Sequence, residues 1–465
     1  MRKITLIVGL LLISFLELKA QKKYEFTVTE AVQFALQNVN DIKNLRVDRK
    51  IQDAKNKELT GQALPQLNGT LSAQYYFNIP VMMFPDFVTP QVYGVLQDEG
   101  VKNGSGSPII KPDEPMKYFP AQFGVPWQAS AGFAFQQLLF QPDVFVGLQA
   151  RSTALKFADM NIQVMEDSVK SNVYRSYYAV LIAEKRKVFL VESIQRLEKL
   201  LSDQNKLYQN GFAEKLDIDK TTVSLNNLRT SNTQTDNFIY VGYASLKYAL
   251  GLGQRDTLML RDTLNVDFVK RDVLDAANFR YEDRSEIRML TTLKELQTMD
   301  VRRYKLSYLP TVAAFWNYSA NAMRQKLTFF NPDEPWFKSS YVGLNINVPI
   351  FDGMQKHYRI RQAQYNLEKT ANNLENMAKV IDLQREAALN IFKNSLSTLD
   401  MQERNMQLAE RVYFTTKKKY ESGLGSSFEV LQADTDFQTA QSNFFQALYD
   451  AATAKIGYYR SLGKL

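Results

Sequence analysis

Alternating apolar and polar residues predict four β-strands in the chain. Between Leu67 and Ile79 every second residue is apolar or small, while the residues between them are mostly polar. A period of two places these two sets on opposite faces of one strand. The same alternation occurs at 127–136, 311–318 and 342–350. Each of the four segments is therefore expected to be a strand with one apolar face and one more polar face.

Two segments without glycine or proline predict long helices. They cover 148–210 and 354–422, which are 63 and 69 residues. At ~1.5 Å per residue each helix would be roughly 100 Å long, over three times the ~30 Å hydrocarbon core of a bilayer. Because charged residues are scattered along both segments, both helices are expected to lie in water.

Both long helices carry a heptad-like apolar seam. The seam residues are Leu190, Ile194, Leu197 and Leu201 in the first helix, and Phe392, Leu396, Leu399, Met406 and Tyr413 in the second. This spacing is typical of helices that pack side by side in coiled-coil fashion. Short glycine-containing breaks follow at 210–213 and 422–425, and further helical segments follow at 214–241 and 426–456. The sequence thus predicts two long helical hairpins, with tips near 210–214 and 422–426.

The chain also contains an internal repeat. A helical segment that runs into Leu64-Pro65 and a strand recurs 245 residues later, before Leu309-Pro310. Later landmarks recur at offsets of 211 and 212 residues, among them Leu250-Gly251 at Leu462-Gly463. The fall from 245 to 211 means that the first copy carries 34 extra residues between its two strands. A repeat with such a long period indicates a structural unit that is used twice.

The predicted strands suit an outer-membrane β-barrel, because they are about ten residues long with aromatic residues towards their ends. Taken alone, each strand would fit a soluble half-buried sheet equally well. Four strands cannot close a membrane barrel, since the smallest known types need about eight, and unpaired strand edges are not tolerated in hydrocarbon. We therefore expect several copies of the chain to share one barrel.

The repeat sets the expected boundaries of the mature chain. The first copy covers 21–253, a linker covers 254–282, and the second copy covers 283–465. Long barrel loops lie on the external side. We therefore expect external loops at 80–126, which contains eight of the 14 prolines, and at 320–340.

The first 20 residues predict a secretory signal peptide. Arg2 and Lys3 precede an apolar run from Ile4 to Leu16, which is too short for a stable membrane-spanning helix. An uncleaved N-terminal anchor is the alternative. The chain has no cysteine, which excludes a lipid-modified N-terminal cysteine and structural disulfides.

Composition and motifs argue against other function classes. The net charge of +8 comes without a nucleic-acid-binding motif, and export also argues against a nucleic-acid partner. No phosphate-binding loop, dinucleotide fingerprint or nucleophile elbow is present, and His357 is the single histidine. Met82-Met83 is more simply a hydrophobic contact than a copper site. We therefore expect no enzyme, no cofactor and no bound metal.

The two hairpin tips carry related sequences. They run from Tyr208 to Asp219 and from Tyr420 to Leu431, each with a glycine three residues after the tyrosine and an acid six residues after that glycine. Together with the duplicated helix–Leu-Pro–strand element, these tips resemble the TolC family of outer-membrane efflux channels over nearly the whole mature chain.

The resemblance implies a mixed α and β membrane protein. Three copies would form a homotrimer whose twelve strands build a β-barrel in the outer membrane, in contact with its lipid, and whose twelve helices build a tube through the periplasm. The function implied is the exit duct of a tripartite efflux pump, with a periplasmic adaptor and an inner-membrane transporter as partners. Two alternatives are the duct of a type I protein secretion system and a soluble periplasmic coiled-coil scaffold.

The resemblance also implies roles for individual residues at the tips. The candidates for the periplasmic gate are Asp217, Tyr420 and Glu429, and the candidates for adaptor docking are Gly211, Phe212, Gly423 and Leu424. Two positions depart from the family, because Gly425 stands where a basic residue is usual and Gln432 where an acid is usual. The alternative for Asp217 is stabilisation of a helix N-terminus, and the alternative for Tyr420 is packing in the seam.

Overall fold

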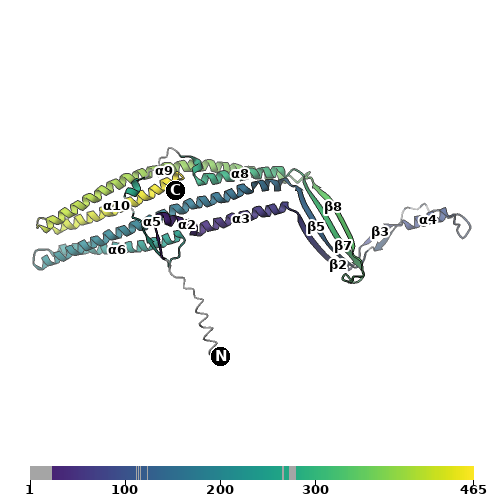
Figure 1. Ribbon diagram of the computed structural model, residues 1–465, viewed down its shortest axis with the longest axis horizontal. Helices are drawn as coiled ribbons and strands as arrows, with labels where there is room; N and C mark the ends of the chain where they lie inside the picture. The colour runs from purple at the N-terminus through teal and green to yellow at the C-terminus, as the bar shows by residue number, and fades with distance from the viewer. Residues whose placement is uncertain are drawn as a thin grey trace, which may run out of the picture. The chain divides into compact units, whose positions relative to one another are not determined.

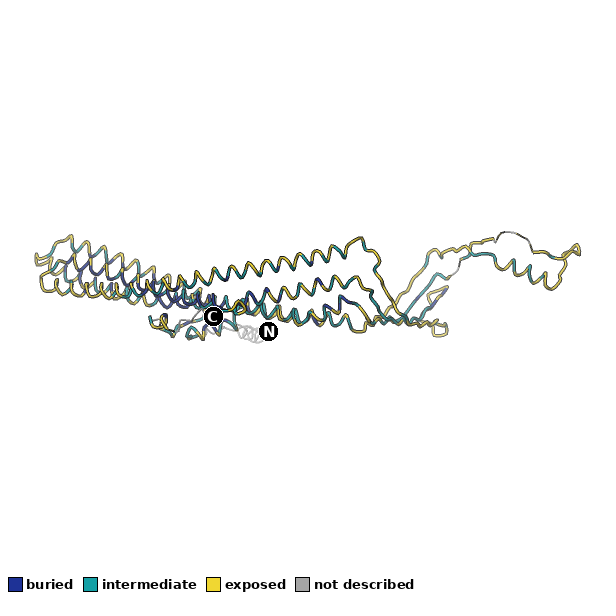
Figure 2. Tube along the Cα trace, turned by 90° about the horizontal axis from the view of Figure 1, so that it is seen from above, coloured by how far each residue is buried: buried dark blue, intermediate teal, exposed yellow. Residues whose placement is uncertain are grey.

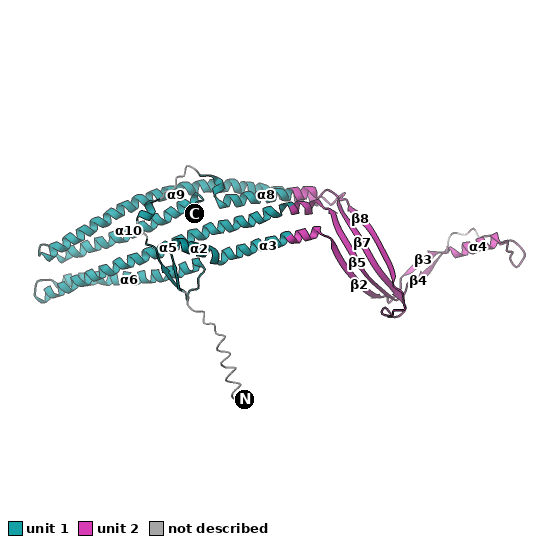
Figure 3. Cartoon of the chain, viewed as in Figure 1, with its two compact units in different colours: residues 1–56, 149–301, 360–465 teal, residues 57–148, 302–359 magenta. Residues whose placement is uncertain are grey.

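The computed structural model describes residues 23–111, 113, 115, 117–122, 124–263, 266–271 and 279–465. The predicted signal peptide at 1–20 lies outside these residues. The chain forms two compact units, coloured separately in Figure 3. The helical unit contains 1–56, 149–301 and 360–465, and the sheet unit contains 57–148 and 302–359.

Two long hairpins dominate the helical unit, as predicted. The helices are α5 (Pro142–Gln209), α6 (Lys215–Leu250), α9 (Gln355–Glu421) and α10 (Ser427–Ser461). Helix α5 begins six residues earlier than predicted, because its start coincides with Pro142, a residue that suits the first helical position. Gly147 is accommodated inside this helix because it faces Leu59, where an added Cβ would lie 2.9 Å from a methyl carbon.

The four helices lie in the order α6, α5, α10, α9 (Figure 1). An ion pair of 2.8 Å between Glu198 and Arg229 joins α5 to α6. Aromatic pairs join the other neighbours: Phe189 of α5 meets Phe445 of α10 at 5.0 Å between ring centroids, and Phe392 of α9 meets Tyr458 of α10 at 5.8 Å. Helices α5 and α10 are thus inner members of the row, while α6 and α9 form its two ends.

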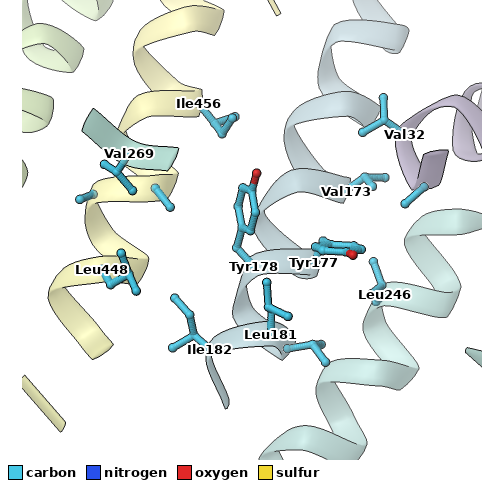
Figure 4. Packing of buried hydrophobic residues seen from close by; sticks show 14 of the residues in the cluster. Val32, Val173, Tyr177, Tyr178, Leu181, Ile182, Leu246, Val269, Leu448 and Ile456 are labelled. Carbon is cyan, nitrogen blue, oxygen red and sulfur yellow. The ribbon is translucent and has the colours of Figure 1, made fainter. Parts of the chain in front are cut away.

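Two hydrophobic clusters hold the row together. The larger one surrounds Tyr177 and Tyr178 and draws on α5, α6, α9 and α10 (Figure 4). The smaller one lies nearer the hairpin tips. All nine predicted seam residues belong to these clusters or pack against them, so the predicted coiled-coil seams are confirmed. Figure 2 shows the buried residues gathering where the hairpins run alongside each other.

Residues 23–38 and the described parts of the predicted linker pack on the middle of the helical unit. The elements are β1 (Lys23–Phe26), α2 (Val28–Asn38), β6 (Thr257–Leu260), α7 (Val266–Lys270) and a 3-10 turn η2 (Tyr281–Asp283), with β1 and β6 paired in parallel. The Lys455 amine donates to the Phe268 carbonyl at 2.8 Å, and Lys270 forms ion pairs with Asp400 at 2.7 Å and Glu403 at 3.6 Å. Glu403 lies in the apolar seam of α9, and its ion pair with Lys270 of α7 accounts for a charged residue there.

The sheet unit contains one four-stranded antiparallel sheet. Its strands are β2 (Gln66–Tyr75), β5 (Trp127–Phe140), β7 (Thr311–Arg324) and β8 (Phe337–Asn347), in the order β2-β5-β7-β8. Helix α3 (Asn40–Ala63) precedes β2 in the chain, and α8 (Ser285–Leu306) precedes β7. Among the described residues, β2 and β8 are edge strands with one partner each.

The registers unite the apolar faces of the four strands. Phe135 lies opposite Leu67 and Trp316, and Trp316 lies opposite Val342. Because facing residues share one side of a sheet, these apolar side chains form one continuous face, as the alternation predicts. The opposite face carries most of the Ser, Thr, Asn and Gln residues of the strands.

Two predicted boundaries were wrong. The first strand ends at Tyr75 instead of Ile79, because Pro126 has no N–H to continue the ladder after its carbonyl accepts from Tyr76 at 2.8 Å. The second loop is shorter than 320–340, because strand pairing continues to Arg324 and resumes at Phe337. The loop at 80–126 is also structured. It holds β3 (Val81–Pro85), α4 (Val88–Asp98) and β4 (Tyr118–Gln122).

Among the described helices, none combines the length and hydropathy that crossing a membrane requires.

Gly132 is required by the close approach of β5 to β7. An added Cβ would lie 2.4 Å from the Tyr318 carbonyl oxygen, whereas at Gly69 of β2 the nearest atom is a ring carbon at 3.7 Å. We expect Gly132→Ala to lower the free energy of unfolding by about 1–3 kcal/mol through overpacking. Gly69→Ala is the matched control and is expected to be neutral. Thermal unfolding followed by circular dichroism would check this, and equal stability of both variants would contradict it.

Candidate functional site

The tips of the two hairpins lie together at one end of the helical unit (Figure 1). The Lys220 amine of α6 lies over the Phe428 ring of α10, 4.9 Å from its centroid. Helix α9 brings Tyr420 to the same place from the second hairpin, close enough for the charge of Asp217 on α6 to affect it. The tips therefore form one cluster of side chains from both halves of the chain, which we call the tip cluster.

Both turns use the same backbone geometry. Gly211 has a φ of +80° and Gly423 a φ of +75°, a conformation that glycine adopts without steric cost. The Gly211 N–H donates to the Tyr208 carbonyl at 3.0 Å, and the Phe212 N–H to Leu207 at 2.8 Å. The second turn repeats the two bonds at 3.0 and 2.9 Å. This Schellman arrangement satisfies the last carbonyls of α5 and α9 and fixes the direction of each tip.

The residue after each glycine is apolar and exposed. Phe212 is 81% exposed and Leu424 is 83% exposed. The Schellman hydrogen bonds hold both backbones, so these side chains project from rigid turns instead of mobile loops. Fixed, exposed apolar side chains are suited to binding a partner.

The two candidate acids occupy equivalent places. Asp217 and Glu429 are each the third residue of a returning helix. Ser426 caps α10 by accepting from the Glu429 N–H at 3.2 Å. An acid in the first turn favours the helix because it faces the positive end of the macrodipole. Both carboxylates can therefore stabilise the N-terminal end of their own helix, Asp217 in α6 and Glu429 in α10.

Tyr420 is the candidate that joins the two hairpins. It is half-buried and packs against the smaller hydrophobic cluster. Burial raises the pKa of its hydroxyl, and the negative charges of Asp203 and Asp217 raise it further. The hydroxyl therefore stays protonated at neutral pH. Tyr420 therefore both packs in the seam and lies near enough to Asp217 to be affected by its charge.

Glu429 folds over its own turn. A Cβ added at Gly425 would lie 3.3 Å from a carboxylate oxygen of Glu429 and 3.3 Å from the Tyr420 backbone nitrogen. A larger residue at Gly425 would need both groups to give way, which accounts for the glycine. The other departing residue, Gln432, donates to Asp436 on its own helix at 2.9 Å.

A buried ion pair that was not predicted from the sequence lies between α5 and α10, beyond the tip cluster. Asp434 of α10 is 1% exposed, and its carboxylate accepts from Arg196 Nε of α5 at 2.9 Å. Arg196 also donates to Ser193 at 2.5 Å, and Gln438 donates to the second carboxylate oxygen. The pair therefore links the inner helices of the row.

Aromatic rings enclose the Arg196 guanidinium. It lies 5.2 Å from the centroid of Tyr413 and 5.4 Å from that of Phe437, two rings that stack on each other. Burial raises the pKa of Asp434, and Arg196 opposes this effect. One signal in the sequence could have revealed the pair, because Asp434 falls on the buried stripe of α10 between Leu431 and Phe437.

Within the described ranges, no group of three or more His, Asp or Glu side chains is arranged to hold a metal ion. Exposed apolar side chains, acids and a tyrosine at the tips are suited to contact and charge selection.

Comparisons with known proteins agree with this description. The family model described as outer membrane efflux protein matches residues 303–464. Outer membrane protein TolC of Salmonella enteritidis is 20% identical over 350 residues, 73% of this chain and 70% of that protein. The alkaline protease secretion protein AprF of Pseudomonas aeruginosa is 21% identical over 172 residues, 37% of this chain and 35% of that protein. The solved structure of CusC has a TM-score of 0.73 at 15% identity, covering 95% of this chain and 93% of that one.

The buried pair gives a test of how the hairpins are joined. We expect Asp434→Ala to destabilise the helical unit by about 3–5 kcal/mol, because it leaves the Arg196 charge buried without its partner. The double variant Arg196→Met with Asp434→Leu should recover most of this loss. Hydrogen exchange of the α10 amides and thermal unfolding would measure both. A double variant as unstable as the single one would show that the lost charge pairing is not the cause.

Proposed function

The chain belongs to the TolC family of outer-membrane efflux proteins, and we propose that it is the outer-membrane exit duct of a tripartite efflux pump. It would conduct substrates passively from a periplasmic adaptor and an inner-membrane transporter to the cell exterior. The observation that carries the proposal is the four-stranded sheet, with one continuous apolar face and two unpaired edges. Such a sheet is complete only when other copies pair with its edges.

We propose that three copies form the duct. Four strands from each copy would close a twelve-stranded barrel in the outer membrane, because exposed strand edges are not tolerated in hydrocarbon. An aromatic series across one end of the apolar face supports this location. Its members are Phe77, Tyr75, Trp127, Phe329 and Trp336, with successive centroids 4.8 to 6.3 Å apart. Aromatic side chains collect at the membrane–water interface of outer-membrane barrels.

The helical unit supports ring closure independently. Helix α10 buries 18 of its 35 residues, whereas α6, the returning helix of the other hairpin, buries six of 36. The exposed side of α6 carries large apolar residues, among them Tyr240 and Tyr248. We propose that α9 of the next copy covers this side, so that twelve helices form a periplasmic tube.

We also propose that the chain is an internal duplication. A groove of about 860 Å³ beside α10 and one of about 810 Å³ beside α6 support it. Gln384 lines the first groove and Asn172 the second, and Gly457 and Ser245 are related in the same way, both pairs 212 residues apart. The boundaries 21–253, 254–282 and 283–465 are part of this proposal.

At the tips we propose a charge-selective gate. In a trimer Asp217 and Glu429 would each form a ring of three acids, which attracts cations and repels anions. Tyr420 would hold the second hairpin to the first while the gate is closed. Phe212 and Leu424, fixed by Gly211 and Gly423, would be docking contacts for the adaptor.

A type I secretion duct is the second candidate. The similarity to AprF over 37% of the chain favours it, since that protein's name refers to alkaline protease secretion. Both candidates place the protein in the outer membrane with its helices in the periplasm, and they differ in the transporter and the substrate. Copurification of the inner-membrane partner would distinguish them.

Assembly and location can be tested together. We expect the mature protein to fractionate with the outer membrane and to have three times the mass of one chain by light scattering after detergent is subtracted. Recovery of a monomer from the soluble periplasm would contradict the duct and favour the soluble scaffold.

The gate can be tested by neutralising its acids. We expect Asp217→Asn with Glu429→Gln to reduce cation selectivity in planar bilayers, about twofold to tenfold in permeability ratio if the two rings together contribute roughly 1 kcal/mol. Glu375→Gln, which removes an exposed acid paired with Lys379 elsewhere on α9, is the control. Unchanged conductance and selectivity in the double variant would remove both acids from the constriction.

A further inference from the structure

The β3–β4 ribbon continues the β2–β5 pair. The sheet ladder ends where Tyr75 faces Trp127, and β3–β4 pairing resumes where Val81 faces Gln122. Strand β3 follows β2 in the chain, and β2 is an edge of the sheet. The ribbon therefore extends the edge hairpin of the sheet unit (Figure 3).

The base of the ribbon exposes apolar side chains on both faces. Phe77 is 91% exposed, and Val81, Met82 and Met83 are each more than half exposed. A two-stranded ribbon is marginally stable alone in water and needs a packed face. Phe77, Val81 and Met83 form a surface that we call the ribbon base. We therefore expect another apolar surface to pack against it.

The turn between β7 and β8, at 325–336, presents a second apolar surface at the same end of the sheet. The turn is held rigidly, since Arg324 Nη2 donates to the Pro335 carbonyl at 2.8 Å and the Thr328 hydroxyl to Glu334 at 2.9 Å. Phe329 is buried against Trp127 of β5. Its neighbour Phe330 is 96% exposed.

Leu327 of the same turn is also exposed. Such a rigid turn can present these two apolar side chains at little entropic cost on association.

We propose that the β7–β8 turn of one copy packs against the ribbon base of the next copy. Phe330 and Leu327 would lie on Phe77, Val81 and Met83. The inference rests on the proposed ring of three copies. In that ring the β8 edge of one copy meets the β2 edge of the next. The turn directly precedes β8, and the ribbon directly follows β2.

A second copy is the occupant that matches both surfaces. Each chain carries one ribbon base on its β2 side and one turn on its β8 side, so a closed ring pairs every base with one turn. The contact is heterologous, and it closes only in a cyclic assembly. This apolar contact, which we call the clasp, would lie beyond the end of the strand pairing. On one of the two copies it would be made by residues of the longer first loop.

Cysteine crosslinking in the full-length protein tests this contact, because the natural chain has no cysteine. Val81→Cys or Met83→Cys is combined with Phe330→Cys, and outer membranes are treated with bismaleimides of short and long spacer. We expect covalent dimers and trimers from both pairs and none from the single variants. Ile110→Cys with Phe330→Cys is the matched control, because Ile110 is similarly exposed but lies beyond α4.

The outcomes separate this contact from the duct itself. A trimeric mass without crosslinks in either pair, or with equal crosslinking through Ile110, overturns the clasp and leaves the duct standing. A monomeric mass overturns the duct instead. In addition, Leu327→Ser with Phe330→Ser should lower the temperature at which the trimer dissociates by several degrees, while Ile110→Ser should not. Equal dissociation temperatures would also contradict the clasp.

Discussion

Unsatisfied backbone groups along the edges of β2 and β8 are the constraint on which the rest of this structure depends. The faces of the sheet are complete, with apolar side chains on one side and polar ones on the other. The edges are not complete, because each edge strand has one partner among the described residues. An N–H or C=O without a partner costs several kcal/mol in hydrocarbon. In the proposed duct, the edges of neighbouring copies would satisfy those groups by pairing with each other.

The row of helices, like the sheet, has a closed interior and two outer members. In the row the contacts are made by side chains, whereas in the sheet they are made by backbone groups. Its inner seam, between α5 and α10, is closed within the chain by the Arg196–Asp434 pair and the stacked rings of Tyr413 and Phe437. Its outer helices, α6 and α9, each have one side that the described part of the chain does not cover. The seams inside one chain are therefore chemically different from the seams that we propose between copies.

Periodicity gave the strands, the long helices and the seams because each depends on local spacing. The face of Leu67 and the seam of Leu197 could be read directly from neighbouring residues. The tip glycines were equally readable, since a break after a long helix favours a glycine with positive φ.

Features that depend on contacts between distant segments could not be read in this way. The ion pair joins Arg196 to a residue 238 positions later, and the place of Asp434 between Leu431 and Phe437 does not show which base it meets. The end of β2 at Tyr75 is set by Pro126, the residue directly before β5. Nothing near Glu403 in the sequence indicates that Lys270 is its partner. In each case the local sequence does not show which distant segments come into contact.

The open edges have a consequence for the life of the chain before assembly. A newly exported copy presents two free strand edges of ten and eleven residues together with the exposed side of α6. Free edges of this length can pair with any extended segment that they meet, including another immature chain. The yield of the duct is then a kinetic matter, set by how fast copies find each other compared with how fast they aggregate. The open strand edges therefore need to be shielded between export and assembly, just as the assembled protein needs its contacts.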